Sequence, residues 1–412
     1  MHLANSVASN NPIEDYHSEH ESKDGLVVGI YDGHSGPQCA ATVSKVLSSY
    51  VQRELNIISS GSDGLKPKDK VIDGIKDAFV KLDNDITLGS LLLDSPSTSN
   101  SWLSWNPFYK RTDYAQVLKG IRTAAAGSCA IIAFLQGDEV YVACTGDCRA
   151  VIGRNLGYES QYEALELSKD QTATDPTEFS RLCEEHPGED ATVVVRGRVL
   201  GGLMPSRAFG TFLILMIVLN ITLGDARYKW PLSVLEVVSP VLGRRIPPNY
   251  HTPPYVTAKP EVSYYKRDKS DEFLILACDG LWDFMSSKTA VKVVKEMMDK
   301  GYDENYATAL IQAGISGYGS GGSILDKERI QHSLSIPAPK CRRFRDDMSV
   351  NVLFFPTSNV SIGKMEQSKV VDSVPPFPPT QSPQLYGWIG YLKNLNKPKS
   401  PTSTPPLTKS KL

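Results

Sequence analysis

The pattern of apolar and polar positions divides most of the chain into short strands and amphipathic helices. Residues 26–31 form an apolar run that predicts a buried strand, and this run leads directly into Asp32-Gly33-His34. Apolar positions then recur at helical spacing over residues 43–55 and again over residues 71–86. Two amphipathic helices are therefore expected after the first strand.

Strand-like runs dominate the middle of the chain. Residues 129–135 and 139–144 are rich in β-forming residues and a third run begins at Arg149, which predicts an antiparallel meander. Further strands are expected at residues 192–200, 272–277 and 349–355, and helices at residues 176–185, 289–298 and 304–313. Because strands and helices occur in separate runs, the pattern indicates an α+β fold with antiparallel sheets rather than alternating βαβ units.

Three segments depart from this pattern. Residues 88–126 are rich in Ser, Asn and Pro, which is typical of a long insertion. The apolar run at residues 211–223 is shorter than the roughly 20 residues that cross a bilayer, so no transmembrane span is expected. The Pro, Ser, Thr and Lys content of residues 357–412 predicts a mostly disordered tail that follows a single large domain over residues 1–356.

Composition excludes several classes of function. The 44 basic and 46 acidic residues of the 412-residue chain give a net charge of -2, so no global positive field attracts a polyanion and no nucleic-acid partner is expected. The seven cysteines are scattered and form no C-x-x-C pair, which indicates neither a disulfide framework nor a zinc site. The first residues have neither a basic amphipathic stretch nor an apolar core, so no presequence or signal peptide is expected there.

Acidic side chains lie where predicted strands begin or end, at Asp32-Gly33, Asp279-Gly280 and Asp346-Asp347. If these strands are neighbours in sheets, the carboxylates converge at one rim, and such hard oxygen ligands select Mg²⁺ or Mn²⁺. Any single Asp-Gly pair has a simpler explanation, because this pair is common in turns. The three pairs together are what favours a metal site.

Six motifs occur in one order along the chain: Pro12-Ile13-Glu14-Asp15, residues 28–36, Gly127-Ser128, residues 145–150, residues 277–283 and residues 345–350. In this combination they resemble the metal-dependent type 2C protein serine/threonine phosphatases. The resemblance covers about residues 10–356. It implies a four-layer sandwich of two antiparallel β-sheets flanked by α-helices.

Within that family, residues 200–210, 228–230 and 246–255 are similar to the pyruvate dehydrogenase phosphatase branch. This similarity implies phosphoserine on the E1 component of the pyruvate dehydrogenase complex as the substrate, and a mitochondrial location.

The resemblance also implies a mechanism and a set of metal ligands. Two Mg²⁺ or Mn²⁺ ions about 4 Å apart would share a bridging water and hold the phosphate for in-line attack, without a covalent enzyme intermediate. By the family pattern Asp32 bridges both ions, Gly33 offers its carbonyl to one, and Glu14 anchors metal-bound water. The carboxylates on the other side are Asp279 and Asp346, and those that match a third, weaker metal are Asp147 and Asp283.

His34, next to the bridging carboxylate, matches the family's general acid, which protonates the departing serine oxygen. The alternative is a histidine that hydrogen-bonds only its own turn.

Three features differ from the family pattern. Many family members carry a phosphate-binding arginine four residues before the Glu14 position, but here the residue is Asn10, so phosphate must rely on the metals or on a basic residue elsewhere. Only nine residues precede Asn10, which suggests a truncated gene model and an initial strand that is missing or shortened. Residues 211–224 separate Gly210 from Asp225, which are adjacent in relatives; a retained intron or a mispredicted splice site is favoured over a functional hydrophobic hairpin.

Two functions are compatible with these motifs: an active phosphatase, and a catalytically impaired phosphatase fold that binds phosphoproteins as a regulator. The complete acidic set favours the enzyme. For the location, the family resemblance favours mitochondria. The chain also ends in Ser410-Lys411-Leu412, a tripeptide that peroxisomal import receptors read, so a peroxisomal fraction is expected as well.

Overall fold

The computed structural model describes residues 2–59, 66–92, 126–157, 161–210, 228–229, 232, 246–301, 305–318, 326–338 and 340–356. Three segments discussed above lie outside these residues: most of the 88–126 insertion, the apolar block at residues 211–224, and the tail from residue 357 to the terminal Ser410-Lys411-Leu412. The expectations for these segments, and the domain boundary at residue 356, stay predictions.

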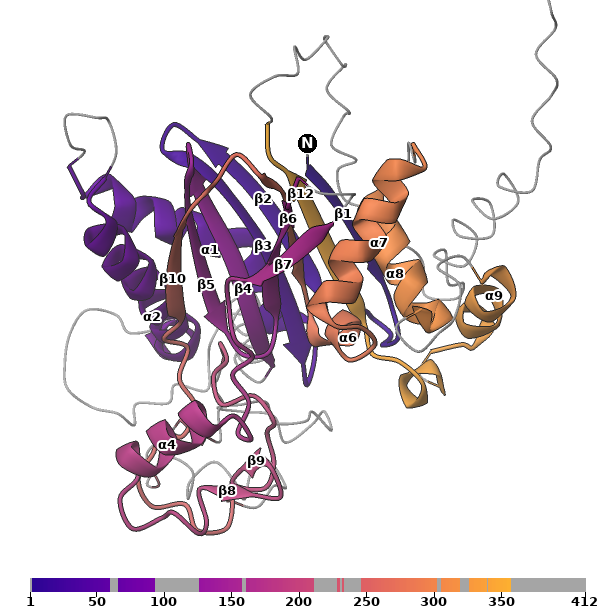
Figure 1. Ribbon diagram of the computed structural model, residues 1–412. Helices are drawn as coiled ribbons and strands as arrows, with labels where there is room; N and C mark the ends of the chain where they lie inside the picture. The colour runs from indigo at the N-terminus through magenta and orange to yellow at the C-terminus, as the bar shows by residue number, and fades with distance from the viewer. Residues whose placement is uncertain are drawn as a thin grey trace, which may run out of the picture. The chain divides into compact units, whose positions relative to one another are not determined.

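Two five-stranded antiparallel sheets form the centre of the fold (Figure 1). The first sheet has the order β1 (His2–Val7), β12 (Met348–Phe354), β11 (Asp271–Ala277), β6 (Arg149–Asn155) and β7 (Tyr162–Glu166). The second has the order β10 (Glu261–Lys266), β5 (Glu139–Thr145), β4 (Gly127–Gln136), β3 (Gly25–His34) and β2 (Tyr16–Ser22).

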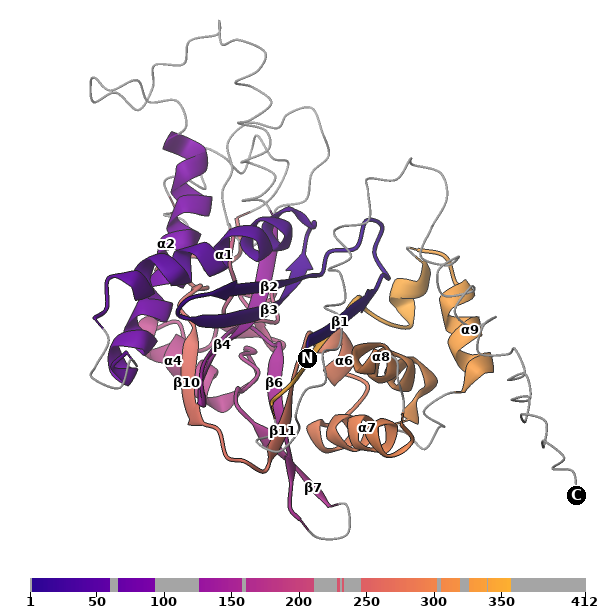
Figure 2. The same cartoon turned by 90° about the horizontal axis from the view of Figure 1, so that it is seen from above.

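Helices cover the outer face of each sheet, as the view from above shows (Figure 2). Helices α1 (Gln38–Asn56) and α2 (Lys68–Leu92) pack on the second sheet. Helices α7 (Ser287–Asp299) and α8 (Tyr306–Ser316) pack on the first sheet, and α9 (Lys327–Ser335) lies beside α8. The predicted four-layer α+β sandwich is therefore confirmed.

Strand β4 shows why the inner strands read as continuous apolar runs. Ala130, Ile132 and Phe134 face the helices α1 and α2, whereas Cys129, Ile131 and Ala133 face the opposite sheet. Because side chains alternate between the two faces of a strand, a strand buried on both faces has no polar positions to alternate with.

The predicted meander is wrong at its third strand. Strands β4 and β5 pair as expected, but β6 leaves their sheet and pairs with β11 and β7 in the other one. The chain crosses between the sheets at Thr145-Gly146-Asp147-Cys148, where Gly146 has a φ of +106° that favours glycine. This crossing carries Asp147 to the end of the sandwich.

One further expectation is wrong, and another is narrowed. Residues 192–200 do not form one strand; they form the short hairpin of β8 (Val194–Val195) and β9 (Arg198–Val199), because Arg196 and Gly197 turn the chain with positive φ angles. The initial strand is not missing, since β1 pairs with β12 along all six of its residues; that it is shortened stays a prediction.

Helix α4 (Pro176–Glu185) agrees with the expectation from the sequence. It begins as expected, with the Asp175 side chain accepting hydrogen bonds from the backbone N–H groups of Thr177 and Glu178. All seven cysteines are free. Within the part of the chain that the structure describes, no helix is both long and apolar enough to pass through a membrane.

The residues on either side of the apolar block, Gly210 and Lys229, both donate hydrogen bonds to the carboxylate of Asp83. The backbone N–H of Gly210 donates to Asp83 Oδ1 at 2.9 Å. Lys229 Nζ donates to the two oxygens of the same side chain at 2.9 and 2.8 Å. Residues 210 and 229 are therefore neighbours in space, although the apolar block separates them in sequence.

Candidate active site

Three of the predicted carboxylates meet at one end of the sandwich. Asp32 lies near the C-terminal end of β3, and Asp147 lies in the crossing between the sheets. Asp279 is the first residue of the short helix α6 (Asp279–Trp282). One oxygen of each carboxylate lies within 4.8 Å of the others. The fold therefore gathers acids from both sheets.

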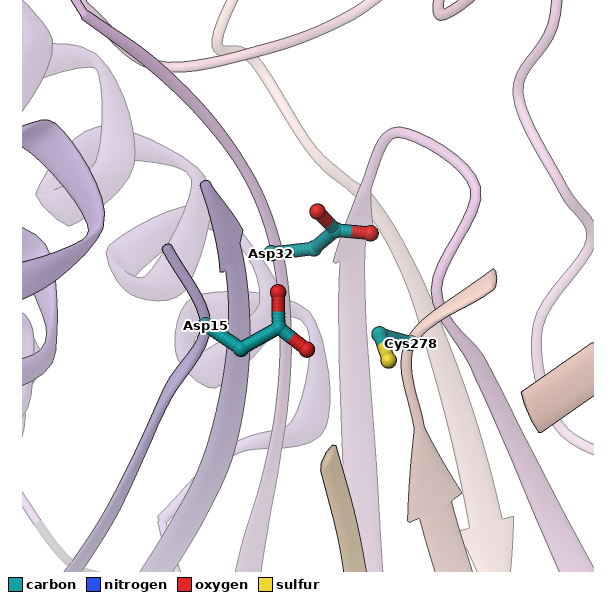
Figure 3. Close-up of side chains that lie close together, drawn as sticks. All are labelled: Asp15, Asp32 and Cys278. Carbon is teal, nitrogen blue, oxygen red and sulfur yellow. The ribbon is translucent and has the colours of Figure 1, made fainter. Parts of the chain in front are cut away.

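A second group shares Asp32 with the first. It joins Asp32 to Asp15 and to the thiol of Cys278, and the three ligand atoms again lie within 4.8 Å of one another. Figure 3 shows the Asp15 carboxylate beside that of Asp32, with Cys278 facing both. Sequence reasoning selected Glu14 from the Glu14-Asp15 pair and missed Asp15. The available signal was the pair itself, because neighbouring residues in an extended segment point in opposite directions.

The electrostatics of these groups favour a cation. Burial, reinforced by the charge of Asp347, raises the pKa of Asp15 to about 8, and burial with the charge of Asp279 raises the pKa of Asp147 to about 7. Burial and the neighbouring carboxylates also raise the pKa of Asp32 well above its usual value. Oδ2 of Asp15 is buried without a hydrogen-bond partner. Crowded, desolvated oxygen ligands of this kind fit a divalent cation such as Mg²⁺ or Mn²⁺.

The other predicted site residues are not members of these groups: they are Glu14, Gly33, His34, Asp283 and Asp346. Burial, followed by the charge of Asp347, raises the pKa of Glu14, while the positive charges of Arg342 and His34 oppose this rise. The carboxylate of Asp346 forms an ion pair with Arg342. Partial burial and the charge of Asp279 raise the pKa of Asp283.

The glycines of the two Asp-Gly pairs allow close backbone contacts. A Cβ atom at Gly33 would lie 2.2 Å from the carbonyl oxygen of Glu14, and one at Gly280 would lie 1.9 Å from that of Asp347. Both distances are far below any van der Waals contact, so only glycine fits at these positions. The pairs thus do more than make turns, because they let the segments that carry Glu14 and Asp347 approach Asp32 and Asp279.

Asp347 organises the N-terminal loop, residues 8–14, although sequence reasoning did not select it. Its buried carboxylate accepts hydrogen bonds from the backbone N–H groups of Ser9, Asn10 (2.8 Å) and Glu14 (2.8 Å), and from Asn10 Nδ2 (3.0 Å). Four donors on one carboxylate hold the loop more than 330 residues away in sequence. This placement could not be found from local pattern.

Arg345 strengthens the same contact. Its Nη1 donates to the carbonyl of Ala8 at 2.8 Å and to the hydroxyl of Ser9 at 2.6 Å, and the Ser9 hydroxyl donates to the carbonyl of Asp346 at 2.7 Å. The backbone around Asp346 and the N-terminal loop therefore form one hydrogen-bonded unit.

A buried ion-pair network supports the Asp147 crossing. Burial opposes ionisation of Glu178, but hydrogen bonds from Arg207, Arg181 and Ser206 lower its pKa to about 2. The backbone N–H of Ser206 donates to the carbonyl of Gln171 at 2.9 Å, and Gln171 Oε1 accepts the N–H of Gly146 at 2.9 Å. The network thus connects α4 to the crossing that carries Asp147.

Comparison with known proteins identifies the family. Residues 4–322 match the family described as Protein phosphatase 2C. The chain belongs to the protein phosphatase 2C family. It is therefore a metal-dependent protein serine/threonine phosphatase, as the resemblance implied.

Relatives of this protein phosphatase 2C chain include enzymes of the pyruvate dehydrogenase branch. A protein phosphatase 2C homologue of Schizosaccharomyces pombe is 34% identical over 390 residues, which cover 85% of this chain and 79% of the relative. The mitochondrial pyruvate dehydrogenase phosphatase 1 of Saccharomyces cerevisiae is 30% identical, and the alignment covers 85% of this chain and 67% of the relative. The mitochondrial pyruvate dehydrogenase phosphatase 2 of Homo sapiens is 28% identical, and the alignment covers 87% of this chain and 78% of the relative.

The fold is also found among solved structures. The serine-threonine phosphatase 2C from Toxoplasma gondii aligns with a TM-score of 0.52 at 16% sequence identity, over 86% of this chain and 94% of that one. At this identity the likeness supports the fold.

Proposed function

We propose that this chain hydrolyses phosphoserine and phosphothreonine with a water activated between two divalent cations, Mg²⁺ or Mn²⁺. The observation that carries the proposal is the pair of ligand groups that share Asp32, one with Asp147 and Asp279 and the other with Asp15 and Cys278. A carboxylate common to two ligand groups is suited to bridging two cations. Such cations supply Lewis-acid polarisation of the phosphate and lower the pKa of water.

The residues around Asp32 have separate roles in this proposal. By the family pattern Asp279 and Asp346 would hold one cation together with Asp32, the carbonyl of Gly33 would hold the other, and Glu14 would orient water. Asp147 lies with Asp32 and Asp279 in this structure, so it would border the first cation and, with Asp283, would provide a third, weaker position. Asp15, which belongs to the Pro12-Ile13-Glu14-Asp15 motif but was not selected as a ligand from the sequence, lies against Asp32 and adds a further carboxylate. His34 protonates the departing serine oxygen, and its charge acts on the carboxylates of Glu14 and Asp147.

The proposed substrate is phosphoserine on the E1 component of the pyruvate dehydrogenase complex, inside mitochondria. Two relatives that span most of this chain are named for that activity and that location. A peroxisomal fraction directed by Ser410-Lys411-Leu412 remains part of the proposal. Imaging an N-terminally tagged chain with and without these three residues tests it, and identical distributions would remove the peroxisomal fraction.

Phosphate release from an E1 phosphopeptide, compared with an unrelated phosphopeptide of equal charge, tests the substrate. The assay uses the purified chain with EDTA, Mg²⁺ or Mn²⁺. We expect metal-dependent release that is faster on the E1 peptide, lost in Asp32→Asn and retained in Asp138→Asn, a control in the exposed β4–β5 turn. Binding of the phosphopeptide without phosphate release would instead favour the regulator, and equal rates on both peptides would contradict the E1 assignment.

A further inference from the structure

Asn10 cannot supply the positive charge that the resemblance places at its position. Its side-chain Nδ2 donates to Asp347 Oδ2 at 3.0 Å, and its backbone N–H donates to Asp347 Oδ1 at 2.8 Å. The amide is neutral and already serves to fix the N-terminal loop. A phosphate dianion at this site is therefore held by the proposed metals alone or with the help of a basic residue from another part of the chain.

Arg342 lies in the right place to be that basic residue. It belongs to the 3₁₀ helix η3 (Lys340–Arg343) and forms an ion pair with Asp346 through Nη1. Its charge also acts on Glu14, the carboxylate at the end of the N-terminal loop. The side chain is 44% exposed, so the guanidinium contacts the acidic site while remaining open to solvent.

Two other arginines, Arg149 and Arg345, are committed to internal contacts. Arg149 holds Asp170 with two hydrogen bonds, from Nε at 2.9 Å and from Nη2 at 2.6 Å. Arg345 is only 7% exposed and is bonded to Ala8 and Ser9. Arg342 differs from both, because its partner Asp346 is itself a residue of the proposed site.

We propose that Arg342 binds the phosphate group of the substrate in place of an arginine at position 10. A planar guanidinium has five N–H donors and binds phosphate oxygens in a bidentate manner, so it can contact Asp346 and a phosphate oxygen together. The proposal deepens the proposed function and rests on the phosphatase site around Asp32. It makes Arg342 a substrate-binding residue rather than a metal ligand.

The decisive measurement is the inhibition constant of inorganic phosphate at saturating Mn²⁺, determined for R342A and for the matched control R343A. Arg343 lies next to Arg342 on the same helix and is also exposed. Loss of a charge-assisted phosphate contact should raise this constant, and the KM for phosphopeptide, by roughly ten- to a hundredfold in R342A. R343A should stay within about twofold of the wild type, a change too small to reflect loss of such a contact.

Three further readouts separate phosphate binding from a structural role. R342K keeps the positive charge but loses the planar guanidinium with its paired N–H donors, so its inhibition constant for phosphate should fall between those of the wild type and R342A. The double variant N10R/R342A should recover part of the phosphate affinity. The Mn²⁺ concentration for half-maximal activity should change little in R342A.

An inhibition constant for phosphate that changes less than about threefold in folded R342A, or changes equally in R343A, overturns the role of Arg342. The same holds if R342A alters only the Mn²⁺ requirement. Failure of the proposed function is recognised separately, because the wild-type chain would then release no phosphate from phosphopeptides.

Discussion

Replacing Asp347 with Asn should loosen the N-terminal loop and weaken metal-dependent activity. Each Asp347 oxygen accepts two hydrogen bonds: Oδ1 from the backbone N–H groups of Ser9 and Asn10, and Oδ2 from Asn10 Nδ2 and the N–H of Glu14. An asparagine keeps one of these oxygens and presents an NH₂ group in place of the other. Rotation of the Asn10 amide can restore one contact, but the N–H of Glu14 then faces another donor.

The magnitude follows from these contacts. Hydrogen bonds to a charged group contribute about 1.5–3 kcal/mol each, so losing up to two costs at most about 3–6 kcal/mol. The substitution also removes the negative charge that raises the pKa values of Glu14 and Asp15, and this relief offsets part of the loss. We expect the free energy of unfolding to fall by about 2–4 kcal/mol, which leaves a domain of ordinary stability folded.

Three measurements on Asp347→Asn test this reasoning: urea unfolding, amide hydrogen exchange, and the Mn²⁺ dependence of activity. Amide exchange should accelerate at Ser9, Asn10 and Glu14, and half-maximal activity should need more Mn²⁺. Asp138→Asn, whose parent residue pairs with Arg267 on the surface, is the control and should change stability by no more than about 1 kcal/mol. A loss of stability under about 0.5 kcal/mol with unchanged exchange at Glu14 would refute the proposed role of Asp347.

Three other substitutions or deletions give distinct expectations. Asp32→Asn or Asp279→Asn should abolish activity with little loss of stability, because each substitution relieves repulsion in the acidic cluster. A variant that retains more than a tenth of the wild-type activity, which corresponds to a barrier change below about 1.4 kcal/mol, would contradict this. Glu178→Gln should cost about 3 kcal/mol at neutral pH, since the folded pKa of about 2 lies below the ordinary 4.5. That stabilisation is present above pH 4.5 and disappears as the pH falls through about 2, so urea unfolding of the two proteins should converge in acid and would remain parallel if the network were not responsible. Deleting residues 211–224 should raise soluble yield and activity, because Gly210 and Lys229 already meet at Asp83; lower activity in the deletion variant would show that the block is functional.

The six inner strands could be predicted from sequence, whereas the four edge strands could not. The strands β3, β4, β5, β6, β11 and β12 are buried on both faces or nearly so, and their apolar runs are continuous. The edges are β1, β2, β7 and β10. Strand β2, for example, reads Tyr-His-Ser-Glu-His-Glu-Ser and is largely exposed, so its hydrogen bonds to β3 leave no hydrophobic signal.

The sequence by itself determined the α+β class with antiparallel sheets and the aspartates at the ends of inner strands, because burial and turn chemistry are local properties of the chain; the four layers were implied by the family resemblance. Only the tertiary structure decided that β6 changes sheets and brings Asp147 to Asp32 and Asp279. It likewise decided that Asp15 faces Asp32, and that Asp347 holds a loop more than 330 residues away. These contacts depend on which strands pair and on which way neighbouring side chains point, and both are set by long-range packing that no local window of sequence contains.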